Sequence, residues 1–511
     1  MLTPIHVRGR RKKPLPAAQK HNDAPSAAST AAPAPAPASR KRKPGRPLMS
    51  PDELRHSSQS RSIKRVRIIT KQSKSLRQKG RRHLSNLERL PVELIEKIFL
   101  YSLNVNLPRC SNVLAAAVSS ERIYRALILL AFWDDSCALI TTAEGIDNDD
   151  DARQQKSSAV AAIKRILRPL DYTPLTVDQR KTLQTALVRC HWCTFPRILK
   201  SLPDLMALTI QRHWISAGII MTPIDEERLS QFLSREETAT TEDLPHPSFE
   251  GTITPAKDPL TPHTYTMTIT PPTSIHIVST LHAHTHTHPT FSPLLFPDSL
   301  LRGRTGFPTP HIIFLETLRV ASGLNSPDLI SPTISLRHDA LHEGIHMALI
   351  EENHRALATL LKLDEYVFRA EITSVTTDAN SVPYTLPAEH FRTAVRVARD
   401  DPACFQMLVR ASAESVPDDA EVTQWAMELD DAFGHWLLDL MVRLPRQIEA
   451  ANGNPAEAAV FYLGRANTQV ELARRYVSDV LGVEELGSWM EETVVDLGEV
   501  WRGRGDWDPI G

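Results

Sequence analysis

Large apolar residues are sparse over the first 85 residues and become dense between residues 87 and 135. In the stretch PVELIEKIFLYSL they recur at the three-to-four spacing of one helix face. These positions are Leu94, Ile95, Ile98, Phe99 and Leu103. The pattern predicts a helix with Pro91 at its first position, which proline tolerates well.

Two further helices are predicted in the same block. Pro108 opens a short helix that runs to about Val118, and Ser119 or Ser120 can cap the next one. In this third helix the positions Ile123, Tyr124, Leu127, Leu130 and Ala131 form one face. We expect that face to be core.

The middle of the chain also has helical periodicity. Helices are predicted near 159–168, 176–200 and 203–217, and DEERLSQFLSREE reads as an amphipathic surface helix. Thr176 and Gln179 have the spacing of a capping box.

Alternation with a period of two appears only between residues 241 and 310, which are rich in Pro, Thr and His. TYTMTIT and SIHIVST alternate and are separated by PPT, which predicts two strands joined by a turn. We expect β-structure in this region alone.

Three helix pairs of similar design are predicted near the C-terminus. GIHMALIEENHRALATLLKL, EHFRTAVRVARDDPACFQMLVRA and AEVTQWAMELDDAFGHWLLDLMVRL each place a polar break between two apolar helices. Stacked pairs of this kind bury faces that one unit cannot bury alone. Their spacing is irregular, so the predicted repeat is degenerate.

These patterns predict a mainly α fold with a small β-containing region. The predicted boundaries are a disordered basic arm at 1–85, a three-helix module at 86–135, a helical region at 136–240, a Pro/Thr/His-rich β-hairpin region at 241–310, helical hairpins at 311–500 and a tail at 501–511. The Ala/Pro/Ser-rich arm cannot bury enough apolar surface to offset its chain entropy. No apolar run is long enough for a membrane helix, so we expect a soluble protein without membrane contact.

The net charge of −1 is the sum of two oppositely charged parts of the chain. Residues 1–85 contain 22 Lys and Arg against 3 Asp and Glu, a charge of +19, which leaves −20 on the rest. Such an arm favours nuclear import or weak, non-specific contact with nucleic acid. We therefore expect a nuclear or cytoplasmic location, or both.

The stretch RKRKPGRP within the arm resembles an AT-hook, which lays Gly-Arg-Pro into the narrow A·T minor groove. Gly45, Arg46 and Pro47 match the core of that motif, and the flanking cations are Arg40, Lys41, Arg42 and Lys43. An import signal or solvated charge explains the same residues and is the favoured interpretation.

Two stretches could bind metal. CHWC at 190–193 has zinc-knuckle or redox spacing, but no second pair exists to complete a zinc site, which favours two packed apolar residues. HAHTHTH places His282, His284, His286 and His288 on one side of a strand, and a low-complexity surface loop is favoured over a metal site. No phosphate loop, nucleophile elbow or metalloprotease motif is present, so we expect neither catalysis nor a metal or cofactor.

The segment LPVELIEKIF resembles the start of an F-box, whose pattern is Leu-Pro, a spaced Glu-Leu and Ile-Phe. The longer run to residue 135 is similar to a variant found in filamentous-fungal F-box proteins. The resemblance implies a three-helix module of about fifty residues that docks the Skp adaptor of a cullin-type ubiquitin ligase. The residues expected to bind the adaptor are Leu90, Pro91, Leu94, Ile95, Ile98 and Phe99.

The physics of a small module is consistent with docking. About fifty residues cannot bury every apolar side chain, so an exposed patch is expected. Leu90, Leu94 and Ile98 supply the spacing of helix-in-groove anchors and are expected, with Pro91, to face the partner.

These observations favour an F-box substrate receptor whose helical body recruits an unknown protein target. Two alternatives remain open. One is a nuclear, nucleic-acid-associated scaffold that uses the basic arm. The other is an ankyrin-like interaction protein without ligase function, suggested by HMALIEENHRALATLL.

Overall fold

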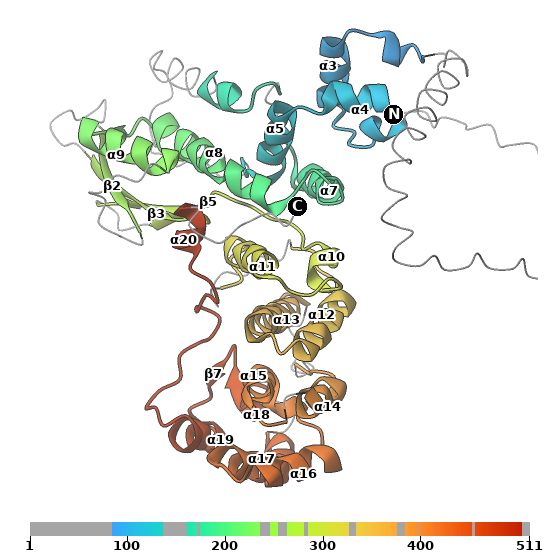
Figure 1. Cartoon of the computed structure of the whole chain (residues 1–511). Coiled ribbons are helices and arrows are strands. Elements are labelled where there is room, and N and C mark those ends of the chain that lie inside the picture. The colour runs from blue at the N-terminus through green and yellow to red at the C-terminus, as the bar shows by residue number, and fades with distance from the viewer. Residues whose placement is uncertain are drawn as a thin grey trace, which may run out of the picture. The chain divides into compact units, whose positions relative to one another are not determined.

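The computed structural model divides the chain into two units, residues 1–83 and 84–511. It describes residues 84–135, 161–170, 174–235, 246–253, 263–280, 285–325, 334–375, 384–397, 399–451 and 455–502. The AT-hook-like stretch and nearly all of the predicted disordered arm lie outside these residues. Within them, no helix is both long and apolar enough to cross a bilayer. The described chain is mainly helical with a small antiparallel sheet, as predicted (Figure 1).

The first described module contains η1 (Leu87–Arg89), α3 (Val92–Ser102), η2 (Leu107–Cys110), α4 (Asn112–Val118) and α5 (Glu121–Phe132). Pro91 is the N-cap of α3 rather than its first helical residue. The predicted second helix is two elements, because Ser111 starts a new helix by accepting a hydrogen bond from the Val113 amide. Ser120 caps α5 in the same way.

The next helices are α7 (Val177–Leu187), α8 (Phe195–His213) and α9 (Pro223–Ser234), with a 3-10 turn η3 (Ile215–Ala217) after α8. The Thr176–Gln179 capping box is present in full. The predicted helix break near residue 200 is wrong: α7 ends before CHWC, and α8 runs through Pro203. Pro203 cannot donate to the Leu199 carbonyl one turn earlier, and that carbonyl instead accepts from Arg235 Nη2 at 3.0 Å.

The sheet has the strand order β1-β2-β3-β4-β5 and is antiparallel throughout. Its strands are β1 (Ile220–Met221), β2 (Ser248–Ile253), β3 (His263–Thr270), β4 (Ser274–Ser279) and β5 (Thr285–Pro289). The predicted hairpin is β3–β4, with Met267 opposite Ile277. The expectation of β-structure in that region alone is wrong, because β1 and a separate pair, β6 (Phe461–Tyr462) and β7 (Arg465–Ala466), lie outside it.

The C-terminal half consists of paired helices. After α10 (Asp298–Leu301) and α11 (Thr309–Ala321) come α12 (His338–Ile350) with α13 (His354–Val375), α14 (Ala388–Val397) with α15 (Ala403–Ser412), and α16 (Ala420–Leu429) with α17 (Ala432–Ala450). The three predicted helix–break–helix segments are these last three pairs. First helices contact first helices in the series α10, α12, α14 and α16, and second helices do so in the series α11, α13 and α15.

A C-terminal segment follows these pairs and returns along them. It contains α18 (Pro455–Ala458), β6, β7, α19 (Glu471–Arg475), the π-helical turn η5 (Tyr476–Val480) and α20 (Leu497–Arg502). Figure 1 shows it in red, passing from the last helix pair back to α20 near the sheet. There Trp501 stacks on Phe232 of α9 at 5.2 Å between ring centroids.

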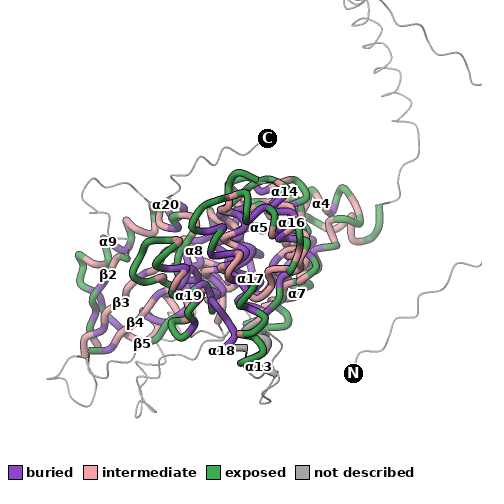
Figure 2. Tube along the Cα trace, turned by 90° about the horizontal axis from the view of Figure 1, so that it is seen from below, coloured by how far each residue is buried: buried purple, intermediate pink, exposed green. Residues whose placement is uncertain are grey.

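One hydrophobic core joins nearly all of these elements. It runs without interruption from Ile95 of α3 to Trp501 of α20, and Figure 2 shows buried positions along the central helices. The link between the first module and the body is α5, which packs on both α7 and α8. The first module therefore lies next to a large hydrophobic core, and any apolar side chain that stays exposed in it does so although burial is available nearby.

Gly344 in α12 has no room for a side chain. A Cβ atom there would lie 1.9 Å from the carbonyl oxygen of Leu301 in α10. Gly344→Ala is expected to lower the free energy of unfolding by about 1–3 kcal/mol, because overpacking outweighs the gain in helix propensity. Chemical denaturation measures this, and Gly487→Ala, where a Cβ meets nothing within 4 Å, is the control. Equal stability of both variants would contradict the tight α10–α12 contact.

Candidate functional site

An apolar face of α3 is exposed. Leu94, Ile98 and Tyr101 are 47%, 40% and 70% accessible, and at ~100° per residue they lie within an arc of about 60°. Pro91 is exposed just before the helix. Six of the seventeen exposed large apolar side chains in the described residues fall between Leu84 and Val113. Among these six, Leu94, Ile98 and Tyr101 share one face of α3 and form an apolar patch, whereas Val92 lies about 160° around the helix from Leu94.

The opposite face of α3 belongs to the core. Ile95 and Phe99 are 1% and 3% accessible, about 100–140° around the helix from Leu94. We expected Ile95 and Phe99 to contact the adaptor. In this fold they are core residues and are not accessible to a partner, because α4 packs on their side of α3. Leu90 is half-buried against the same core. Ile123, Leu127 and Leu130 are buried, as expected for the third helix.

Hydrogen bonds fix the N-terminal end of this face. The Ser85 amide donates to Glu88 Oε2 at 2.6 Å, and the Glu88 amide donates to Ser85 Oγ at 3.3 Å. Ser111 donates to the other oxygen of Glu88 while it caps α4. The hydrogen bonds from Ser111 and Ser85 hold the pKa of Glu88 below its ordinary value. The carboxylate thus ties η1 to α4, and Leu90 and Pro91 leave η1 in a fixed direction.

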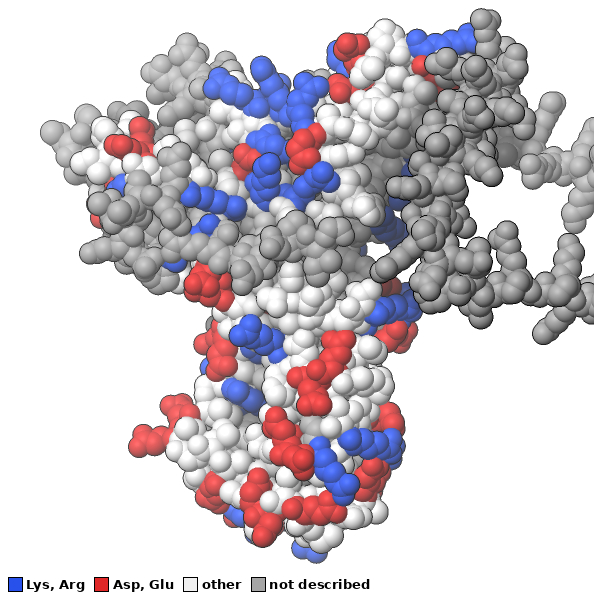
Figure 3. All heavy atoms as spheres, viewed as in Figure 1, with Lys and Arg blue, Asp and Glu red and all other residues white. Residues whose placement is uncertain are grey.

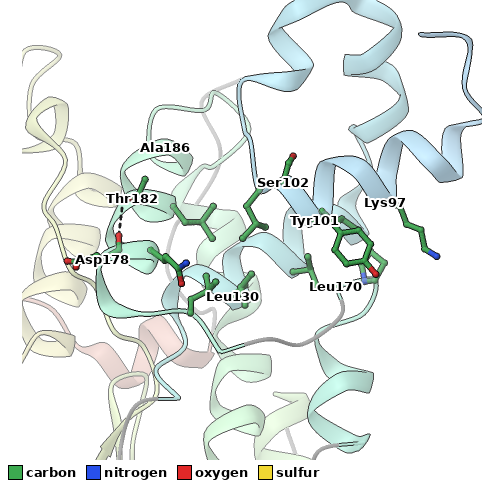
Figure 4. A pocket seen from close by; sticks show the side chains of 14 residues that line it. Lys97, Tyr101, Ser102, Leu130, Leu170, Asp178, Thr182 and Ala186 are labelled. Carbon is green, nitrogen blue, oxygen red and sulfur yellow. Dashed lines mark hydrogen bonds between the residues drawn. The ribbon is translucent and has the colours of Figure 1, made fainter. Parts of the chain in front are cut away.

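A cavity of about 740 Å³ lies at the C-terminal end of the same helix. Part of its wall is the second half of α3, including Lys97 and Tyr101, with the C-cap Leu103; the rest comes from α5, α7 and the residues around Leu170 and Leu175. Figure 4 shows Tyr101 and Leu170 on one side and Asp178 and Thr182 of α7 on the other. Tyr101 therefore belongs to both the exposed face and the cavity, so the face continues into a hollow.

Sequence reasoning missed Tyr101 and the cavity. A signal for Tyr101 was available, because it continues the face of Leu94 and Ile98 by one helical turn. The cavity had no such signal. Residues about eighty positions apart form its walls, and no local pattern brings them together.

Charge is unevenly distributed over the described body. Figure 3 shows Lys and Arg gathered over α5, α8 and the helical residues 161–166, and more carboxylates over the paired helices. Part of the basic face is neutralised: Arg125 pairs with Asp204 at 2.6 Å and Arg197 with Glu121 at 3.1 Å.

The CHWC stretch lies in the turn between α7 and α8. Cys190 and Cys193 are half-buried, and Cys190 Sγ donates to the Ala186 carbonyl at 3.4 Å. Burial raises the pKa of the Cys193 thiol to about 12. A thiol that is protonated at neutral pH is a poor nucleophile, and both cysteines pack against the hydrophobic core, so the packing interpretation is the better one.

The histidine-rich stretch is not a surface loop throughout. His288 of β5 is 3% accessible and stacks on His213 of α8 with 3.8 Å between ring centroids. His282 and His284 lie outside the described residues. The expectation of a loop is wrong for His288 because β5 pairs with β4 and packs against α8.

Within the described part of the chain, no three His, Cys, Asp or Glu side chains are arranged to hold a metal ion.

No protein-family model, curated protein or solved structure matches this chain.

Proposed function

We propose that this protein is an F-box substrate receptor. Its α3 face docks the Skp adaptor of a cullin-type ubiquitin ligase, and its helical body recruits a protein target. The observation that supports this most is that Leu94 and Ile98, inside the F-box-like LPVELIEKIF, stay exposed beside a continuous core.

The geometry of the face suits a partner that offers an apolar groove. Leu94, Ile98 and Tyr101 occupy successive turns on one side of α3, the arrangement of anchors in helix-in-groove recognition. Burying one large apolar side chain contributes about 1.5–3 kcal/mol. Because the three anchors are 40–70% accessible in the free protein, docking gains only part of this for each, and the rest of the interface must help to offset the loss of translational and rotational freedom.

The role of the body in this proposal is proximity. A receptor holds its target at high effective concentration near the ubiquitin carrier, and the chemical step belongs to the assembled ligase. The paired helices α12 to α17 offer exposed surface for such a target, including Met427 and Val442.

The proposal predicts that the full-length protein binds a purified Skp adaptor. The double variant Leu94→Asp/Ile98→Asp is expected to weaken that binding at least 100-fold, because two carboxylates would lose their hydration at the interface. Calorimetric titration measures the affinity, and a thermal melt checks that the fold persists.

Val442→Asp is the matched control. It places the same charge at an apolar residue that is 69% accessible on α17, and it should leave adaptor binding unchanged. Absence of binding by the wild-type protein would refute the ligase proposal, as would equal affinities for the wild type and the double variant.

A further inference from the structure

Charged side chains on the second helices converge on the C-terminal segment. The helices α11 and α13, and α15 together with the 3-10 turn η4 (Ala413–Ser415) that follows it, each present one cation and one carboxylate three or four residues apart. These pairs are Glu316 with Arg319, Lys362 with Glu365, and Arg410 with Glu414. We call the surface they form the charged groove. All six side chains form hydrogen bonds to backbone groups or the indole of residues 460–494.

The pair on α11 forms hydrogen bonds to both kinds of backbone group in the segment, carbonyl oxygens and an amide. Arg319 donates to the carbonyl oxygens of Met490 at 2.8 Å and Glu492 at 3.0 Å. Glu316 accepts from the Val494 amide at 3.3 Å. Both charged residues are fully buried, and they also form a two-point ion pair with each other.

The pairs on α13 and α15 continue this arrangement. Lys362 Nζ donates to the Glu492 carbonyl at 2.8 Å, and Arg410 Nη2 donates to the Gly487 carbonyl at 3.0 Å. Glu365 accepts from the Leu463 amide at 2.7 Å. The Glu414 carboxylate accepts from the Val460 amide. Cations thus meet carbonyls and carboxylates meet amides along the whole groove.

One side chain of the segment is recognised specifically. Trp489 is 3% accessible, its Nε1 donates to Glu365 Oε2 at 3.3 Å, and the cations of Lys362 and Arg410 lie 5.9 and 5.4 Å from its ring. Gly464 makes room for the indole, since a Cβ there would lie 2.0 Å from Trp489. An aromatic side chain is therefore the anchor of the contact.

These contacts have two consequences. While the segment covers these charges, its backbone groups satisfy them, so a polypeptide that takes its place must supply equivalent donors and acceptors. Most of the hydrogen bonds go to backbone groups, which every polypeptide carries. A second polypeptide can therefore offer the same groups in place of this segment.

We propose that the charged groove is a binding site for a polypeptide segment with an aromatic anchor, filled in this structure by the chain's own residues 487–494, beside residues 460–464. The ligand class is a segment of the recruited target that carries an aromatic residue at the position of Trp489, which here lies in a turn. Binding of the target displaces the chain's own segment. The identity of this ligand rests on the proposed receptor function, whereas the groove chemistry does not.

Competition within the chain sets the expected affinities. A tethered segment acts at an effective concentration of roughly millimolar, so a free peptide should bind the wild-type protein poorly. Replacing Trp489 should weaken the contact of the chain's own segment and make the charged groove accessible to a free peptide. In the wild-type protein the chain's own segment occupies the groove.

The test uses the full-length protein and a labelled peptide of residues 487–494, GSWMEETV. Fluorescence anisotropy is expected to show at least 10-fold tighter binding to the Trp489→Ala protein than to the wild type. A peptide with alanine in place of its tryptophan should lose this binding, and so should adding Lys362→Met to the Trp489→Ala protein. A folded Trp489→Ala protein that does not bind the peptide would overturn the proposal.

If Trp489→Ala does not fold, the proposal is tested instead with a wild-type protein that is cut by a protease after folding. A protease site is inserted between residues 451 and 455 and cut after folding. Exchange of the C-terminal fragment for an added labelled peptide of residues 455–502 supports the proposal. Retention of the fragment against a large excess of that peptide overturns it. Adaptor binding is measured on the same samples, so a failure of the groove is distinguished from a failure of the α3 face.

Discussion

Arg319→Met is expected to lower the free energy of unfolding by about 3–5 kcal/mol, because it leaves the carboxylate of Glu316 buried without its cation. Burial alone would raise the pKa of Glu316, but the hydrogen bonds and charge of Arg319 hold it below its ordinary value. Arg319 also donates to the carbonyls of Leu324, Met490 and Glu492. The variant would leave these acceptors without that donor.

Urea denaturation at neutral pH measures this loss. Glu316→Leu combined with Arg319→Met should be less destabilising than Arg319→Met alone, because no orphan charge remains. Arg443→Met, which removes a half-exposed ion pair with Asp439, should cost about 1 kcal/mol or less. If Arg319→Met and Arg443→Met lose similar amounts, the buried pair does not have the assigned role.

Mild acid is expected to destabilise the protein strongly, through three buried histidines. Burial, reinforced by neighbouring charges, lowers the pKa of His213 to about 3 and that of His288 and His390 to about 4. None of their Nδ1 atoms has a hydrogen-bond partner. The groups that face them include Asp134 and Arg212 at His213, His276 and His286 at His288, and His342, His346 and Asp364 at His390.

The sign follows from proton binding in the two states. An unfolded histidine titrates near pH 6.5, so between pH 6.5 and about 4 the unfolded chain binds protons that the folded chain refuses. Stability is complete above that window and falls as the pH drops through it. At pH 5 each histidine removes about 2 kcal/mol, and the three together remove about 4–6 kcal/mol. Asp364, whose pKa is lowered to about 2 mainly by hydrogen bonds that overcome its burial, adds a loss only below this window.

Denaturation curves at pH 7.5, 6 and 5 test this prediction. His213→Phe combined with His288→Phe keeps two stacked rings but removes two of the titrating groups, so its stability should fall less between pH 7.5 and 5. His435→Gln, at an exposed position, should follow the wild type. A wild-type stability that is flat between pH 7.5 and 5 would contradict the burial of these rings.

Local patterns predicted the elements well where local chemistry decides them. The Thr176–Gln179 box, the β3–β4 hairpin and the three C-terminal helix pairs depend on neighbouring residues, and all were visible in the sequence. The break at Ser111 and the continuity of α8 through Pro203 were not. In both cases a hydrogen bond or a packed neighbour outweighed the average tendency of the residue.

The candidate site was predicted in part. Helical spacing placed Leu94 and Ile98 on one face, and both are exposed. The same spacing cannot tell which of two apolar faces is covered, so it included Ile95 and Phe99, which α4 and the core enclose. Sequence reasoning missed Tyr101, although it continues this face by one turn. It could not predict the cavity, because residues of α7 form part of the wall.

The sequence by itself determined the periodicity of the helices, the alternation of the hairpin and the charge of the arm, because each is a property of neighbouring residues. Only the tertiary structure decided which charges are buried. Arg319, Lys362 and Glu365 look like ordinary surface charges in their helices, and they are buried because a segment 98 to 173 residues further along the chain covers them. No local pattern carries that information, since the covering residues make their hydrogen bonds through the backbone that every sequence shares.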